Sequence, residues 1–258
     1  MKTTLLTNVF NEEYLLPFWL HHHKGMFDDI IIIDYRSTDN SIEICKSICP
    51  NCKIVETRNE YFDCQDIDTE FMEIENLIEG IKIVLNTTEF LICETSVNDI
   101  FTDTENLYSY NITSISPYSN NSYNIDNYCD LFKNLLNDDI RYHYDREVRH
   151  LHNFPNGNYH IGRHKTYNVT TLTNKAHIVW FGFYPWNDRL INRKLQISQN
   201  MTEQDRIKGL GYQHFWSRER MEEHIRYKVN CGDLLINLNP SLYNLLHNKY
   251  NNNDEMEL

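Results

Sequence analysis

Two short clusters of polar side chains stand near the start of the chain, each directly after an apolar run. Asn11 and Glu12 follow the first run, and the segment Asp34 to Ser41 (DYRSTDNS) follows four consecutive isoleucines. Carboxylate and amide groups held in place accept hydrogen bonds from the N–H and O–H groups of a nucleobase or a ribose. The chemistry that these residues favour is therefore ligand recognition through hydrogen bonds.

The elements that must position these clusters follow from the spacing of apolar residues. We expect buried strands over residues 3–10, 29–34, 52–56 and 89–93. Helical spacing predicts helices between them, over residues 12–24 (with Asn11 as N-cap), 41–48 and 66–85. This alternation predicts an α/β fold with a mostly parallel sheet covered by helices. Ligands of such sheets bind at the carboxyl ends of the strands, where both clusters fall, as do residues 58–60 and 94–99.

The second half of the chain has a looser pattern. It predicts a strand and loop over 111–130, a hairpin over 141–168 that turns at 155–157, a strand over 175–183, and helices over 186–198 and 217–228. We expect a single domain over residues 1–247, with a ligand-binding half over 1–103 and a smaller mixed half over 104–247. The polar segment 248–258 predicts a disordered tail.

Composition narrows the class of protein. The chain has 258 residues and a net charge of -13, which disfavours non-specific binding of nucleic acid, because that binding depends on Lys and Arg. No apolar run approaches the roughly eighteen residues of a membrane-spanning helix, and no apolar leader follows Met1. The seven cysteines, with Cys49 and Cys52 in a CPNC sequence, lack the spacing of a zinc site. We expect structural thiols in a soluble, cytoplasmic protein.

The first forty residues resemble the opening of GT-A fold glycosyltransferases, in particular the family 2 and family 92-like group. There the pattern is N-E-x-x-x-L-P-x-W, a strand, and then D-x-x-S-T-D-x-S. The matching residues are Asn11, Glu12, Leu16, Pro17, Trp19, Asp34, Ser37, Thr38, Asp39 and Ser41. Weaker similarity continues through residues 146–164, the YPWND and RKLQI segments and the start of the helix at Ser217, so that it covers about residues 1–230.

The resemblance implies a GT-A fold and a nucleotide-sugar donor linked to uridine or guanosine diphosphate. Asp34 would accept hydrogen bonds from the base, and Asn11 and Glu12 would line the pocket of the base and ribose. Ser37 belongs to the same donor-binding loop. Asp39 would hold the ribose, or it caps the helix that follows.

The resemblance also implies Mn²⁺ or Mg²⁺, which this fold binds with a D-x-D motif after its fourth strand. Glu94 and Ser96 have that spacing after residues 89–93, and Asp99 follows. We expect Glu94 at the ribose, with Asp99 and Ser96 at the metal, although an acidic surface turn explains the same residues.

The resemblance implies roles at the diphosphate for two residues near the start of the helix expected over 217–228. His214 would complete the metal shell or touch the diphosphate, and a buried structural histidine is the alternative. Arg218 would pair with phosphate oxygens, and a charge on the helix surface is the alternative.

The acceptor side needs a general base, since an acceptor hydroxyl must lose its proton. Asp188 in the PWND segment matches the family position, although capping of the next helix explains it equally well; Asp145 and Glu147 are the alternatives. His164 and His177 would line the acceptor pocket, or they are structural. The triplet His21 to His23 is not a metal site, because adjacent residues of a helix point in different directions.

Three functions remain to be compared. The leading hypothesis is a metal-assisted glycosyltransferase acting on a glycan or protein acceptor. The alternative is a degenerate relative that binds a nucleotide or glycan without turnover. A nucleotidyltransferase is disfavoured, because the segment after the first strand lacks a phosphate loop rich in glycine and basic residues.

Overall fold

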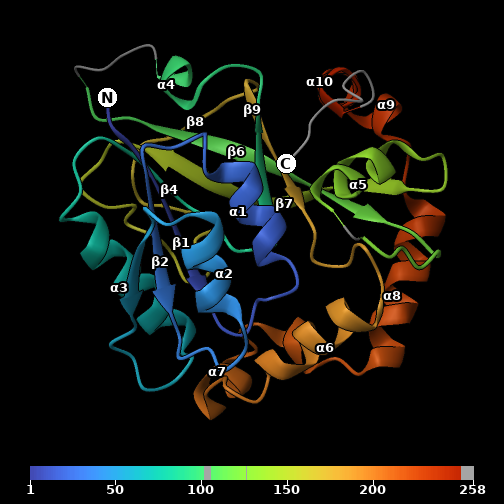
Figure 1. Ribbon diagram of the computed structural model, residues 1–258, viewed down its shortest axis with the longest axis horizontal. Helices are drawn as coiled ribbons and strands as arrows, with labels where there is room; N and C mark the ends of the chain where they lie inside the picture. The colour runs from blue at the N-terminus through green and yellow to red at the C-terminus, as the bar shows by residue number, and fades with distance from the viewer. Residues whose placement is uncertain (102–105, 126, 251–258) are drawn as a thin grey trace.

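A mixed β-sheet flanked by helices forms the body of the molecule (Figure 1). The computed structural model describes residues 1–101, 106–125 and 127–250, and within them the side chains of all residues except 145–147. The strands are β1 Thr3–Val9, β2 Asp29–Asp34, β3 Lys53–Glu56, β4 Ile81–Val84, β5 Glu89–Cys93, β6 Ser109–Tyr118, β7 Arg141–His152, β8 Thr171–Leu172 and β9 Ala176–Trp180. The helices are α1 Leu16–His23, α2 Ser41–Ile48, α3 Cys64–Glu75, α4 Val97–Ile100, α5 Tyr128–Lys133, α6 Asp188–Ile197, α7 Glu203–Lys208, α8 Arg218–Cys231, α9 Leu235–Leu238 and α10 Pro240–Tyr250, with 3₁₀ turns η1 Asn134–Leu136 and η2 Tyr212–Phe215.

The order of the strands is β3-β2-β1-β4-β7-β6-β9-β5, with β8 beside β6. The first four are parallel to one another, and β6 and β9 run in the same direction, whereas β7 and β5 run opposite to them. The predicted α/β class with a mostly parallel sheet flanked by helices is confirmed. The central strands are buried on both faces, as the isoleucine run of β2 predicts.

The predicted helix over residues 66–85 is wrong in its second half. α3 ends at Glu75, and Ile81–Val84 instead form β4, which pairs with β1. Gly80 separates the two elements with a φ of 96°, which a helix does not contain. The apolar residues of β4 happen to continue the helical spacing of α3. As a result, residues 89–93 form the fifth strand of the chain and run antiparallel to β9.

Smaller differences concern element ends. The predicted hairpin over 141–168 does not form, because β7 pairs with β6 instead. α1 begins at Leu16 and has no side-chain cap, so Asn11 is not its N-cap. α10 continues through the buried Tyr250, past the predicted start of the tail at residue 248. Residue 103, where the predicted halves divide, and residues 251–258 lie outside the described part. All seven cysteines are free thiols.

Side chains of α1 satisfy the open edge of β5, the last strand in the order. Trp19 Nε1 donates to the Glu89 carbonyl at 3.0 Å, and His22 Nε2 lies 2.7 Å from the Leu91 carbonyl. His23 Nε2 accepts from the Leu91 N–H at 3.2 Å. An exposed strand edge would invite pairing with another chain, and here a helix covers it. His22 and His23 of the histidine triplet therefore have a structural role.

Gly80 gives the first testable prediction. A Cβ at this position would lie 2.2 Å from the Lys2 carbonyl oxygen, in addition to the positive φ. We expect Gly80→Ala to lower the free energy of unfolding by about 2 kcal/mol or more, measured by urea denaturation. The control is Gly25→Ala, because a Cβ at Gly25 would meet no atom of the described residues within 4 Å, and its expected change is below about 1 kcal/mol. Equal losses in both variants would contradict the structure around Gly80.

The buried His22 predicts a dependence of stability on pH. Burial lowers the pKa of His22 to about 3, whereas the unfolded value is about 6.5. As pH falls below 6.5, the unfolded chain binds the proton first, so the free energy of unfolding decreases between pH 6.5 and pH 3 by up to about 1.4 kcal/mol per pH unit. From pH 6.5 to pH 5, the wild type should therefore lose about 1.5 kcal/mol more than His22→Gln. His21→Gln is the comparison: burial and Lys24 also lower the pKa of the partly exposed His21, but less, so this variant should depart less from the wild-type slope. A His22→Gln slope equal to wild type would contradict the assignment.

Candidate functional site

A cavity of about 400 Å³ opens at the carboxyl ends of β1 and β4. Its walls also include the first residue of β5, the last residue of β9, part of α6 and the segment 209–214. A second hollow adjoins it, because both are lined by Phe10, Phe62 and Asn200. We call the first cavity the cleft and the second the side hollow, which extends past Tyr35 and Arg36 after β2. The cleft therefore lies at the edge of the sheet where a ligand is expected.

Two of the predicted donor-binding loops are tied to each other beside the cleft. The Asn11 side-chain carbonyl accepts from the N–H groups of Thr38 and Asp39 at 2.7 and 3.3 Å. The Asn11 N–H donates to Ser37 Oγ at 3.1 Å, and Asp34 Oδ1 accepts from the Ser37 N–H at 2.9 Å. Asn11 has a φ of 51°, which asparagine tolerates better than most residues. The motif residues thus fix the loops after β1 and β2 as one unit.

Asp39 serves both loops as well. Its Oδ1 accepts from the Ser41 N–H at 2.9 Å, at the start of α2, and its Oδ2 accepts from the Glu13 N–H at 3.0 Å. The side chain therefore joins the loop after β1 to the start of α2, whose N-cap residue is Asn40. Of the predicted donor-binding residues, Glu12 is the one whose side chain lines the cleft.

Glu12 is held by a buried arginine from α6. Arg193 Nε and Nη2 donate to the two Glu12 carboxylate oxygens, each at 2.6 Å, and both side chains are about nine-tenths buried. This bidentate geometry is the strongest form of a guanidinium–carboxylate contact. It joins the loop after β1 to α6 across 181 residues of sequence.

Glu89, at the start of β5, forms the second such pair. Arg149 Nε and Nη2 donate to its carboxylate at 2.9 and 2.7 Å. The same carboxylate accepts from the Asn86 N–H at 2.8 Å. His164 lies in the cleft, with Nδ1 2.7 Å from Arg149 Nη1. Burial, followed by Arg149 and Arg163, lowers the pKa of His164 to about 2, so the ring is neutral at pH 7.

Asp68 and Arg163 form the third pair, between α3 and the segment after β7. Asp68 Oδ1 accepts from Arg163 Nη1, and Asp68 Oδ2 accepts from the Gly162 N–H at 2.6 Å. Arg163 Nη2 donates to Asn86 Oδ1 at 2.9 Å, which links this pair to the Glu89 pair. Two of the three ion pairs that frame the cleft are therefore connected through Asn86.

Lys194 also lines the cleft, and it forms no ion pair with Glu12, Asp68 or Glu89, which are paired with arginines. It is 2% exposed and belongs to the buried face of α6 with Leu190 and Ile191. Its ammonium lies 4.0 Å from the centre of the Phe183 ring and 5.9 Å from that of Trp180. Burial, followed by repulsion from Arg193, lowers the pKa of Lys194 to about 7. No hydrogen-bond or ion-pair partner for the ammonium occurs among the described residues.

His214 borders the cleft from η2. Its Nδ1 is buried and has no hydrogen-bond partner in the described part of the chain. Burial, and then the charges of Lys194 and Arg193, lower the pKa of His214 to about 3. The imidazole of His214 is therefore neutral at pH 7, and the residue lines the cleft.

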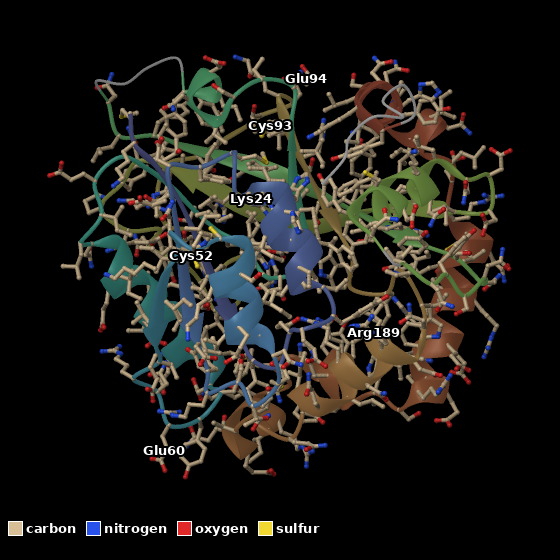
Figure 2. All side chains as sticks on the ribbon, viewed as in Figure 1. Lys24, Cys52, Glu60, Cys93, Glu94 and Arg189 are labelled. Carbon is tan, nitrogen blue, oxygen red and sulfur yellow. The ribbon has the colours of Figure 1, made fainter. Side chains whose placement is uncertain are left out.

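The predicted metal and ribose motif lies elsewhere. Because β5 runs antiparallel to β9, Glu94 follows the end of the strand that is remote from the cleft. Figure 2 shows Glu94 at the opposite side of the molecule from Glu60, which follows β3. Ser96 and Asp99 form a capping box at the start of α4, and Asn98 contacts the amino group of Met1. The structure therefore corrects the proposed ligand set: Glu94, Ser96 and Asp99 are not brought together with His214.

Three further predicted residues lie away from the cleft. Asp188 is at the exposed start of α6 and pairs with Arg218 at 3.0 Å, so the proposed base and the proposed phosphate ligand neutralise each other. His177 is buried on β9, with Nδ1 3.4 Å from the Asn239 side chain. Asp145 and Glu147, the alternatives for the base, have side chains outside the described part of the structure.

The residues of the cleft do not fit a divalent cation. Mn²⁺ and Mg²⁺ prefer carboxylate oxygens, and each of the three lining carboxylates is occupied by its arginine. After β4, the fourth parallel strand, residues 86–88 offer amide and hydroxyl groups alone. Within the described residues, no group of three or more His, Cys, Asp or Glu is arranged to hold a metal ion.

Sequence reasoning missed most residues of the cleft wall. The sequence pattern assigned no role to Arg149, Arg163, Arg193 or Lys194. The signal for Lys194 is its place at helical spacing from Leu190, on the apolar stripe of α6. The arginines have no local signal, because their partners lie 60, 95 and 181 residues away in sequence.

Comparison with known proteins gives similarity to solved structures, whereas no family model and no curated protein matches the chain. Fragment 1–349 of S. aureus TarS matches with 17% identity and a TM-score of 0.37, over 52% of this chain and 40% of that chain. The same fragment in complex with UDP-GlcNAc matches with 18% identity and a TM-score of 0.35, over 52% and 38% of the two chains. Glucosyl-3-phosphoglycerate synthase from Mycobacterium tuberculosis, in complex with Mn²⁺, UDP and glucosyl-3-phosphoglycerate, matches with 13% identity and a TM-score of 0.32, over 45% and 44%. The chain thus spans less than half of the length of either protein.

Among the described residues, no helix is long and apolar enough to cross a bilayer.

The Glu12–Arg193 pair gives a prediction about stability. Removal of one partner from a buried ion pair leaves the other charge unpaired, so Glu12→Gln should lower the free energy of unfolding by about 3 kcal/mol. The control is Glu73→Gln, which breaks the half-exposed pair with Arg58 and should change stability by less than about 1 kcal/mol. Guanidinium chloride denaturation measures both. A loss in Glu12→Gln no larger than in the control would contradict the buried pair.

Proposed function

We propose that this chain is a glycosyltransferase that moves a sugar from a nucleoside-diphosphate sugar to an acceptor hydroxyl. The observation that carries the proposal is the cleft itself. It lies at the carboxyl ends of β1 and β4, and it is lined by the buried Lys194, which has no ion-pair partner among the described residues. Its volume of about 400 Å³ falls in the range of roughly 300–1,000 Å³ that is usual for ligand sites.

The donor would span the side hollow and the cleft. Asp34 Oδ2 is not used by any described residue, so it remains available to the N–H group of a base, as the family resemblance implies. Tyr35 and Phe62, which line the side hollow, offer aromatic surface to the same base. The diphosphate would then lie in the cleft, toward Lys194 and His214.

The proposed reaction is a displacement at the anomeric carbon of the sugar. The acceptor oxygen forms the new bond to that carbon, and the bond from the carbon to the phosphate oxygen breaks. The electron pair of the broken bond stays on the nucleoside diphosphate, and the acceptor proton passes to a base. In the family, a bound Mn²⁺ or Mg²⁺ supplies charge stabilisation to the diphosphate, but the residues of this cleft do not fit such an ion, so no step is assigned to it.

Binding of a nucleotide without turnover is the second candidate function. It is favoured by the state of the cleft carboxylates, since Glu12, Asp68 and Glu89 are all engaged by arginines. Asp188, the proposed base, lies on the surface beside Arg218.

A donor screen tests the proposal. UDP- and GDP-sugars are added to the full chain, and the melting temperature is measured. A donor at one hundred times its Kd stabilises the fold by about 2.7 kcal/mol, which corresponds to roughly 5–10 °C for a domain of this size. Asp34→Asn keeps the contact with Ser37 but removes the charge, and we expect affinity for the donor to fall about 10- to 100-fold.

The matched control is Asp29→Asn at the other end of β2, where Asp29 pairs with the exposed Lys2. It should bind the donor as the wild type does. Release of nucleoside diphosphate in the presence of acceptor glycans then separates transfer from binding alone. The proposal fails when no donor shifts the melting temperature of the wild type.

A further inference from the structure

The charges of the cleft are arranged for an anion and against a cation. Three arginines neutralise the three carboxylates of the wall, which leaves Lys194 as an additional positive charge among the described lining residues. A divalent cation would have to displace a guanidinium from a bidentate contact and then remain near four positive groups. Coulomb repulsion in a partly buried site makes this unfavourable.

The buried position of Lys194 is unfavourable for its charged form unless an anion lies beside it. Lys194 as a residue is 2% exposed, so its ammonium loses much of its hydration, and contacts with two aromatic rings replace that hydration in part. The residue belongs to the buried face of α6 and lines the cleft. An anionic ligand would supply a partner and would favour the protonated form of this amine, whose pKa burial lowers to about 7.

We propose that Lys194 binds the diphosphate of the donor directly and takes the place that a divalent cation has in the related enzymes. This inference rests on the proposed function. Arg193 would contribute from the same helix, although Glu12 neutralises most of its charge. His214 lies at the same wall and offers its free Nδ1 as a second contact.

A diphosphate fits this arrangement better than a single carboxylate or a neutral sugar. Lys194 and the buried Nδ1 of His214 provide two polar contacts at one wall, and a diphosphate has oxygens on both phosphorus atoms to meet them. Charged hydrogen bonds in a desolvated site are stronger than those in water. One lysine in such a site can therefore contribute to the binding of a diphosphate without a metal ion.

The test is calorimetric titration of the full chain with UDP and with GDP, in EDTA and again in excess Mn²⁺. We expect binding of one of them in EDTA, and Mn²⁺ should change Kd less than about threefold. Binding that occurs only with Mn²⁺ overturns the inference and leaves the proposed function standing. No binding in either condition overturns both. This comparison uses the wild-type chain, so it does not depend on the folding of a variant.

A variant then assigns the effect to the residue. In EDTA, Lys194→Gln should weaken UDP or GDP about 10- to 100-fold, as the loss of a charged hydrogen bond predicts. It should weaken UMP or GMP less, so the ratio of diphosphate to monophosphate affinity falls. A structural defect would weaken both nucleotides alike, and that result, or an unchanged affinity, overturns the assignment. Lys208→Gln, an exposed lysine one residue before the cleft segment 209–214, is the control and should bind as wild type.

Discussion

The contact between α1 and β5 is the constraint on which the site depends. β5 is the last strand in the order, yet three side chains of the first helix bind its backbone at Glu89 and Leu91. The sheet must therefore curve around α1, so that its early and late parts become one body (Figure 1). Because Trp19 fixes the backbone of Glu89, it also fixes the carboxylate that orients Arg149 in the cleft. The edge of the sheet and the frame of the cleft are thus set by the same helix.

The cleft wall is assembled from pairs that are distant in sequence. Each buried arginine and its carboxylate come from different elements, and neither partner is stable in a buried place without the other. These pairs contribute little net stability, because desolvation offsets most of the attraction between the charges. Their effect is to define one arrangement of the wall, since any other arrangement leaves a charge unpaired. Lys194 is the exception, because it has no ion-pair partner among the described residues, and a bound anion would provide one.

Part of this structure follows from sequence because it is local. The isoleucine run of β2, the N-cap at Ser217 and the hydrogen bond of Asp39 to the start of α2 depend on neighbouring residues, and the sequence pattern predicts them. β4 could not be separated from α3, because Ile81 and Leu85 continue the apolar spacing of the helix. The direction of β5 is set by pairing with β9, more than eighty residues later. Because this direction was not predicted, residues 94–99 were expected at the edge of the sheet that carries the cleft, whereas they follow the opposite end of β5.

The neutral segment after β4 and the lysine on α6 are related through the charge of the cleft. Residues 86–88 follow the fourth parallel strand, where acidic residues would attract a cation, and here Asn86 is used to orient Arg163 and Glu89. A wall whose described carboxylates are all paired with arginines does not favour binding of a divalent ion. In the proposed function, the positive charge beside the diphosphate therefore comes from the protein itself. α6 is the element that faces this wall, and Lys194 is its residue at the buried position. A fixed ammonium carries half the charge of the ion, but it needs no recruitment from solvent, and its low-dielectric surroundings strengthen its attraction for phosphate oxygens.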